Sequence, residues 1–195
     1  MKFNLRELAK KYHGKLLPIK VCLFDVDGIL TDGLVEYQNN EVTYNRSFNT
    51  TDAFGLKFTK AAGIKVGIIT GGSSIVLSKW FKDYVAVDYF FTGNEDKREA
   101  YHQVLADGYR DEEIFYMGDE FIDFPLLIRA GFSASVPHAP LEIQENVDYV
   151  TTLEGGKGAV REVLELLRYA KGTVPPIKMF YGQKELSHYL RGSGE

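Results

Sequence analysis

Short apolar runs alternate along the chain with amphipathic segments of helical periodicity. The runs lack the polar alternation of strands that face water, which is typical of strands covered on both faces. We expect six strands, at 21–24, 66–69, 89–91, 114–117, 132–136 and 147–150. Helices are expected at 53–62, 74–82, 97–106 and 121–130, and over a last segment from Val160 that ends at Gly172. This order predicts an α/β, Rossmann-like, doubly wound domain whose mostly parallel sheet has helices on both faces.

Residues 33–49 break the alternation. They form two short strand-like runs around a polar stretch that includes Asn39 and Asn40, which suit a tight turn. We therefore expect a β-hairpin that projects as a flap. Leu5, Leu8 and Tyr12 recur at helical spacing near the start of the chain. The expected organisation is a helical extension over 1–18, a main domain over 19–172 and an extended tail over 173–195.

Composition narrows the class of protein. The 195 residues are 45% hydrophobic, enough for one domain with a full core. A net charge of −4 gives no electrostatic footprint for nucleic acid. The single cysteine, Cys22, lies inside the first apolar run, where we expect a core residue, and it excludes a disulfide within the chain. No apolar stretch is long enough to span a bilayer. We expect a cytoplasmic protein without nucleic-acid or membrane partners.

The end of the first apolar run carries two acids, Asp25 and Asp27, separated by one residue. In an extended strand they would share a face, but Gly28 lets the chain turn and frees the second carboxylate for a separate role. Paired acids at the end of a strand suit one nucleophile or metal ligand and one proton donor. Taken alone, the stretch also fits an ordinary surface turn rich in Asp and Gly.

Three further strand ends carry groups that complement this pair. One supplies a hydroxyl and backbone amides that could bind an anion, from Thr70 and Gly71. Another supplies an ammonium, from Lys97, and the last supplies three acids, Asp119, Glu120 and Asp123. Each is ordinary alone, as a turn, a solvated lysine or the acidic first turn of a helix. Sites in open α/β sheets form beyond the carboxyl ends of strands, so we expect them to converge. Together they provide oxygen ligands for Mg²⁺ and cations for a phosphoryl group. His138, after the strand at 132–136, either borders this site or lies outside it.

These motifs, in this order over residues 25–123, resemble the haloacid dehalogenase-like (HAD) superfamily of aspartate-nucleophile phosphatases. The resemblance implies that Asp25 attacks phosphorus and forms an aspartyl-phosphate. It implies that Asp27 protonates the leaving oxygen and then deprotonates water. The implied phosphate-binding residues are Thr70, Gly71 and Lys97. The implied metal ligands are Asp25, the main-chain carbonyl of Asp27, and Asp119, supported by Asp123 and Glu120 from outside the coordination sphere.

Larger members of that superfamily insert a cap domain after the first motif or between the second and third motifs. Here residues 28–52 have room only for the hairpin, and residues 71–96 only for one helix and one strand. The chain looks capless, so we expect neighbouring subunits to close the site.

A narrower resemblance, over residues 19–170, is to the 3-deoxy-D-manno-octulosonate 8-phosphate (KDO 8-phosphate) phosphatases. It is carried by residues 25–33, Phe48 and Asn49, Asp52, residues 118–123 and the glycine-rich segment 155–162. That family forms capless homotetramers in which each subunit helps to close a neighbour's site. The resemblance implies a substrate from lipopolysaccharide precursor synthesis. Further candidates for substrate or interface contact are Thr31, Asp52, Gly72, Lys157 and Arg161.

Two positions depart from that family's pattern. Gly72 stands where many members carry Arg, and Thr51 stands where they often carry a basic residue. Losing a cation that pairs with a sugar carboxylate costs about 1.5–3 kcal/mol of binding. The segment from Asn49 to Asp52 is closer to phosphatases of nonulosonate (sialic acid-type) 9-phosphates, which are the alternative substrates. A non-catalytic oligomerisation module is the alternative of another class, and retention of the catalytic-type acids argues against it.

Overall fold

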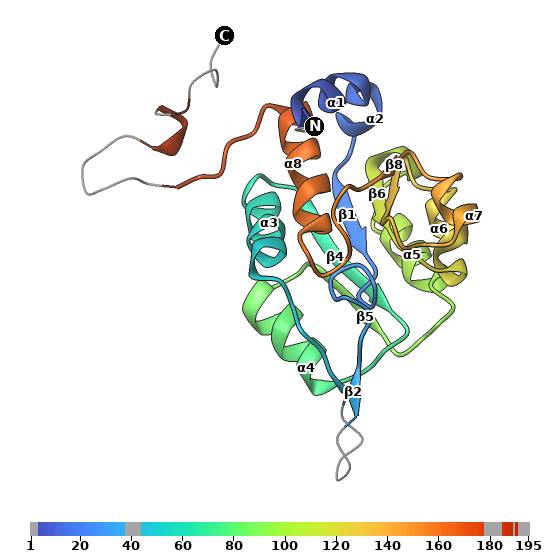
Figure 1. The fold of residues 1–195 in the computed structure, drawn as a ribbon. Helices are drawn as coiled ribbons and strands as arrows, with labels where there is room; N and C mark the ends of the chain where they lie inside the picture. Colours follow the sequence, from blue (N-terminus) through green and yellow to red (C-terminus); the bar gives the residue numbers. More distant parts are fainter. Residues whose placement is uncertain (1–3, 38–43, 178–184, 189, 191–195) are drawn as a thin grey trace.

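The computed structural model describes residues 4–37, 44–177, 185–188 and 190. Six strands form one sheet in the order β5-β4-β1-β6-β7-β8, and every neighbouring pair is parallel (Figure 1). The strands are β1 (Val21–Phe24), β4 (Lys65–Thr70), β5 (Tyr89–Thr92), β6 (Ile114–Met117), β7 (Phe132–Ser135) and β8 (Tyr149–Val150). All four residues of β1 are buried, including Cys22. For β1 this confirms the expectation of a strand covered on both faces, whereas the residues of the edge strand β5 are only partly buried.

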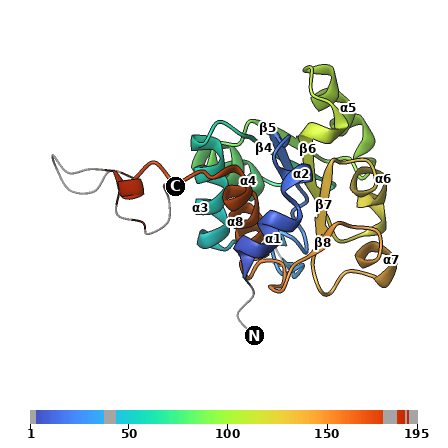
Figure 2. The ribbon, with the colours of Figure 1, turned by 90° about the horizontal axis from the view of Figure 1, so that it is seen from above.

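Helices cover both faces of the sheet. On one face lie α3 (Thr50–Ala61), α8 (Ala159–Lys171), and α4 (Ile75–Leu77) with a π-helix that continues it over Ser78–Val85. On the other lie α5 (Arg98–Ala106), α6 (Phe124–Leu127) and α7 (Leu141–Gln144) (Figure 2). The doubly wound α/β prediction is confirmed.

The helix expected at 121–130 is interrupted. A 3₁₀ turn at Phe121–Asp123 comes first, and α6 then starts with Pro125 in its first turn. Proline lacks an N–H and is tolerated only in the first turn of a helix, so it marks a new start rather than the middle of one long helix. The short helix α7, after Pro140, was not expected from the sequence.

The order of the strands in the sheet indicates where the site lies. From β1 the chain moves outward to β4 and β5 on one side, then returns to β6, β7 and β8 on the other. The reversal lies between β1 and β6, and in open α/β sheets such a switch point opens a crevice beyond the carboxyl ends of the strands. Asp25 follows β1 and Asp119 comes two residues after β6, so both acids stand at this crevice.

The predicted flap is present at its base. The strands β2 (Glu36–Tyr37) and β3 (Tyr44–Asn45) pair antiparallel and project away from the sheet (Figure 1). The expected turn at Asn39 and Asn40 lies outside the described residues. Among the described residues, this hairpin is all that stands between β1 and α3, so there is no cap domain there.

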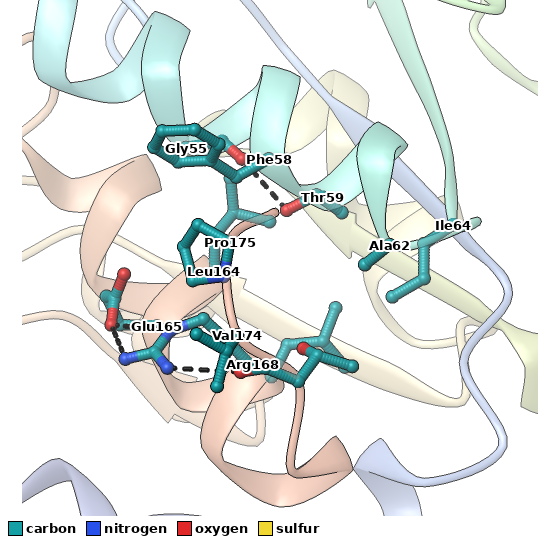
Figure 3. Close-up of a pocket in the computed structure, with 12 residues that line it drawn as sticks. Gly55, Phe58, Thr59, Ala62, Ile64, Leu164, Glu165, Arg168, Val174 and Pro175 are labelled. Carbon is teal, nitrogen blue, oxygen red and sulfur yellow. Dashed lines mark hydrogen bonds and ion pairs between the residues drawn. The ribbon is translucent and has the colours of Figure 1, made fainter. Parts of the chain in front are cut away.

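The two ends of the chain differ in how they contact the body. The helices α1 (Leu5–Lys11) and α2 (His13–Leu16) pack against α8, and Ala9 and Leu16 are buried there. The segment after Gly172 begins on the body, where Thr173 to Pro175 line a hollow of about 20 Å³ between α3 and α8 (Figure 3). Farther along, it leads away from the body (Figure 1). None of the strand ends discussed above contributes to that hollow. No helix in the described ranges has the length and apolarity needed to cross a membrane.

Candidate active site

Asp25 is the first residue beyond β1. Its backbone N–H donates to the carbonyl of Met117 on β6 over 2.9 Å, which extends the sheet by one residue and fixes the direction of the side chain. The side chain is 9% exposed. Its Oδ1 accepts a 2.6 Å hydrogen bond from Nζ of Lys97. One oxygen of this carboxylate is therefore anchored at the carboxyl edge of the sheet.

Lys97, just before α5, is wholly buried and joins two acids. Its Nζ donates to Oδ1 of Asp25 and to Oδ1 of Asp123, both over 2.6 Å. Taken alone, the sequence is also compatible with a solvated lysine, and the burial excludes that alternative. A buried ammonium that bonds two carboxylates is held in one place.

Asp123 is the junction of the network. Its Oδ1 accepts from Lys97 and from the hydroxyl of Tyr116, and its Oδ2 accepts from the backbone N–H groups of Asp119 and Glu120. The residue is fully buried. It therefore fixes both the lysine and the loop that carries Asp119. Tyr116 was not among the residues expected at the site, because a tyrosine inside an apolar strand looks like a core residue.

Asp27 has a different partner from Asp25. Gly28 has φ of +90°, a left-handed conformation that favours glycine, so the chain turns after Asp27. The Asp27 carboxylate is paired with Arg46, whose Nε and Nη2 donate to Oδ1 and Oδ2 over 2.6 and 2.8 Å. No spacing rule predicts this pair, since Arg46 lies 19 residues after Asp27 and beyond β3.

The end of β4 lies close to the pair of Asp27 and Arg46. Thr70 ends β4 and is 2% exposed, and its Oγ1 accepts from the backbone N–H of Gly72 over 3.2 Å. A Cβ placed on Gly72 would lie 3.6 Å from both Oγ1 of Thr70 and Oδ2 of Asp27. The hydroxyl, the bare backbone of Gly71 and Gly72, and the second acid therefore converge.

A cluster of acids fits a divalent cation. Oxygen atoms of Asp25, Asp119 and Asp123 lie within 4.8 Å of one another. Oδ1 of Asp119 is buried and has no hydrogen-bond partner among the described residues. A Cβ on Gly28 would lie 2.1 Å from Oδ2 of Asp119, so this acid packs against the turn where only glycine fits. Carboxylate oxygens of this kind suit Mg²⁺.

Burial governs the protonation of these acids. It raises the pKa of Asp25 to about 7, and Lys97 opposes the rise. Burial, followed by the charge of Asp123, raises the pKa of Asp119 to about 7. Burial lowers the pKa of Lys97, but Asp25 and Asp123 outweigh it and leave the pKa raised, so the lysine stays charged. An added cation would favour the ionised form of both acids.

The glycine-rich segment packs against the turn at Gly28. A Cβ on Gly155 would lie 1.6 Å from the carbonyl oxygen of Gly28, so the two backbones are in direct contact. The side chain of Asn49 donates to the carbonyl of Gly156 over 3.2 Å. Thr31 is fully buried, and its Oγ1 accepts from the backbone N–H of Gly33. These contacts fix the turn that carries Asp25 and Asp27.

Asp52 lies behind this segment. It is 1% exposed, and its Oδ1 accepts from the backbone N–H of Arg161 in the first turn of α8 over 2.7 Å. Burial raises its pKa to about 6, against backbone hydrogen bonds from Arg161 and Gly158. The side chain of Arg161 pairs with Glu165 and lies over the ring of Phe58. Asp52 is therefore buried behind the glycine-rich segment, whereas Arg161 lines a groove of about 390 Å³ together with Asn49, Thr51 and Lys157.

Two other predicted residues stand near the opening. Lys157 pairs with Glu154 and lines a groove of about 400 Å³, together with Asp32 and residues 47–50 at the base of the flap. Nε2 of His138 lies 3.4 Å from Oδ2 of Asp119, so this histidine borders the acid cluster. The side chain of Glu120 accepts from the N–H of Phe121 at the end of the same loop.

Several known proteins are similar in sequence to this chain over most of its length. The KDO 8-phosphate phosphatase of Haemophilus influenzae is 35% identical over 159 residues, which cover 81% of this chain and 87% of that protein. The chain belongs to the KDO 8-phosphate phosphatase family. No protein-family model matches the chain.

Solved structures of this family and superfamily have the same fold. The KDO 8-phosphate phosphatase of Moraxella catarrhalis, solved with a magnesium ion, a phosphate ion and KDO, superposes with a TM-score of 0.79 at 34% identity. The match covers 83% of this chain and 92% of that chain. A Legionella pneumophila protein described as a HAD-superfamily (subfamily III A) hydrolase gives a TM-score of 0.80 at 35% identity, covering 85% and 91% of the two chains.

Gly72 is one of the two positions at which this chain departs from the family's pattern. The resemblance led us to expect a missing cation at this position, yet a cation lies beside it. A Cβ on Gly72 would be 3.1 Å from Nη2 of Arg46. A larger residue at position 72 would therefore meet the guanidinium. The only sequence sign of this was a basic residue at the base of the hairpin.

Proposed function

We propose that this protein is a Mg²⁺-dependent phosphatase that hydrolyses a sugar phosphate monoester, KDO 8-phosphate, through an aspartyl-phosphate intermediate. One observation carries the proposal. A buried ammonium, Lys97, holds one oxygen of Asp25, at the switch point of a sheet in a chain of the KDO 8-phosphate phosphatase family. An acid held in this way serves as a positioned nucleophile, which is what an aspartyl-phosphate mechanism needs.

Phosphoryl binding falls to the second and third strand ends. Lys97 and the hydroxyl of Thr70 bind the phosphoryl oxygens, with the backbone amides of Gly71 and Gly72 beside them. Phosphoryl transfer depends mostly on positioning and on stabilising charge, so fixed donors of this kind contribute directly. Tyr116 and Asp123 act through Lys97, because they hold its ammonium in place.

Proton transfer falls to Asp27. It donates a proton to the leaving sugar oxygen and then takes one from the water that attacks the aspartyl-phosphate. The two acids have different surroundings, although only Val26 lies between them in the chain. Asp25 is buried against Lys97, while the side chain of Asp27 is 34% exposed and faces the flap.

The acid cluster would hold the metal. Asp25, Asp119 and the main-chain carbonyl of Asp27 are the proposed ligands, with Asp123 and Glu120 supporting from outside the coordination sphere. Bound Mg²⁺ supplies positive charge that neutralises the acids and the phosphoryl group. The unpartnered buried oxygen of Asp119 supports this assignment.

Exposed apolar residues near the open side of the site suggest that the protein forms an oligomer. Leu34 and Val35, at the base of the flap, are 71% and 49% exposed, although both are large and apolar. We propose a cytoplasmic homotetramer in which neighbouring flaps cover these residues and close each site. Within it, Lys157 and the groove beside it would face the sugar.

A second substrate class stays in view. The segment Asn49-Thr50-Thr51-Asp52 is closer to nonulosonate 9-phosphate phosphatases, so those acidic sugars are the alternative. A non-catalytic module is disfavoured, because such a role would not require Lys97 to be buried between two acids.

The deciding experiment is a phosphatase screen with Mg²⁺. We expect phosphate release from KDO 8-phosphate to exceed release from nonulosonate 9-phosphates and hexose phosphates. Asp25→Asn, kept from deamidating, should abolish release while the protein stays folded, and Asp83→Asn, on the surface π-helix, is the matched control. Preference for a nonulosonate 9-phosphate would reassign the substrate. An active Asp25→Asn protein would refute the nucleophile.

A further inference from the structure

Arg46 connects the flap to the catalytic turn. It directly follows β3, yet its side chain is only 6% exposed, and its guanidinium forms two hydrogen bonds to Asp27. Paired hydrogen bonds of a guanidinium to a carboxylate are strong and geometrically specific. The base of the flap is therefore tied to the acid that we assign to proton transfer.

The guanidinium lies beside residues that we assign to the phosphoryl group. It is beside Gly72, and a Cβ there would lie 3.1 Å from Nη2 of Arg46 and 3.6 Å from Oγ1 of Thr70. Thr70 is a proposed phosphoryl-binding residue and Asp27 the proposed donor to the leaving oxygen. Arg46 thus lies close to both the proposed phosphoryl-binding residue and the proposed proton donor.

The pair as seen conflicts with the first chemical step. Both oxygens of Asp27 accept hydrogen bonds from Arg46. In the first step one of these oxygens has to carry a proton and donate it to the leaving group. Arg46 must therefore release Asp27 before the phosphoryl group is transferred.

A carboxylate on the substrate would make this release easy. A guanidinium that leaves one carboxylate for another keeps the same charge and the same paired geometry. A neutral sugar phosphate offers no such partner beyond the phosphate, which Lys97 already binds. Acidic keto-sugars carry the carboxylate, and neutral hexoses do not.

We propose that Arg46 is a specificity-determining residue that exchanges Asp27 for the carboxylate of an acidic sugar phosphate. The exchange frees Asp27 only when an acidic substrate is bound. The inference rests on the proposed phosphatase function and names the substrate group that this site selects.

The test compares kcat and KM for Arg46→Ala, Arg46→Lys and the unchanged enzyme. Two substrates are used: the best acidic sugar phosphate of the screen, and mannose 6-phosphate as the neutral ester. For Arg46→Ala we expect kcat/KM to fall by about 10- to 100-fold on the acidic substrate, mainly through KM, as for a lost charged hydrogen-bonding partner. On the neutral ester kcat should stay the same or rise, because Asp27 is no longer occupied. Arg46→Lys should lie between, since lysine keeps the charge without the paired geometry.

Controls separate this role from a structural one. Arg129→Ala removes an arginine that pairs with Asp111 at the surface, and it should change neither substrate's kinetics. Inhibition by inorganic phosphate should be unchanged in Arg46→Ala, whereas inhibition by KDO should weaken. If Arg46→Ala unfolds, Arg46→Lys still decides the matter through its ratio of acidic to neutral turnover.

Equal losses on both substrates, or no loss on the acidic one, would overturn the proposal for Arg46. A failure of the phosphatase function looks different, because the unchanged enzyme would then release phosphate from no ester at all.

Discussion

The pH dependence of stability tests the acid cluster before any turnover is measured. Burial raises the pKa of both Asp25 and Asp119 to about 7, whereas an unfolded aspartate titrates near 4. Between these values the folded state binds more protons than the unfolded state. Stability is therefore highest below about pH 4 on account of these groups, and it is lost as the pH rises through about 7.

The size of the effect follows from the same values. For one carboxylate with a folded pKa of about 7, raising the pH from about 5.5 to about 7.5 removes about 2 kcal/mol of unfolding free energy. For a domain of this size that lowers Tm by about 4–8 °C. Mg²⁺ replaces the protons as the neutralising charge, so it should flatten the slope and stabilise the protein more at the higher pH.

The assay is thermal unfolding across this pH range, with EDTA and with Mg²⁺. Asp119→Asn should lose most of the Mg²⁺ effect and part of the slope. Asp111→Asn, a change to a partly exposed acid that pairs with Arg129, is the matched control and should keep both. Stability in EDTA that rises between about pH 5.5 and about pH 7.5 would contradict the reasoning. So would Mg²⁺ stabilisation that is equal at both ends of the range.

Two substitutions test the support of the site. Tyr116→Phe removes the hydroxyl that donates to Asp123, so we expect a loss of about 1.5–3 kcal/mol in urea unfolding and a lower kcat with KM little changed; unaltered kcat would show that the hydroxyl does not position the network. Gly155→Ala places a Cβ 1.6 Å from the carbonyl oxygen of Gly28, so activity should collapse. The control Gly14→Ala, in the helix α2 with open space around it, should be neutral or stabilising by about 0.5–1 kcal/mol. Similar activities for the two alanine variants would count against the contact at Gly155.

The pattern of apolar residues predicted most of the fold, because buried parallel strands appear in a sequence as uninterrupted apolar runs. The strands at 21–24 and 114–117 were predicted to the residue, and Asp25 and Asp119 follow from where these strands end. The 3₁₀ turn before Pro125 was missed, because local propensity does not show where a helix restarts. Within the part of the chain that the structure describes, sheet topology alone explains why Asp25, Lys97 and Asp119 meet.

The features that escaped prediction depend on contacts between distant segments. Arg46 reaches Asp27 only because the hairpin returns to its own base, and no spacing rule encodes that path. Tyr116 reads as core, because a buried hydroxyl is recognised only when its acceptor is known. The position of Asp52 behind the glycine-rich segment likewise emerges only once α3 and α8 are packed together.

The contact between Gly155 and Gly28 affects when the active site can form during translation. Every residue that we assign to chemistry is translated before residue 124, but the wall under the nucleophile turn comes from the last third of the chain. A nascent chain that stops short of Gly155 would carry a complete set of reactive groups on an unsupported turn. Competence should therefore arrive late and abruptly, when that final third docks.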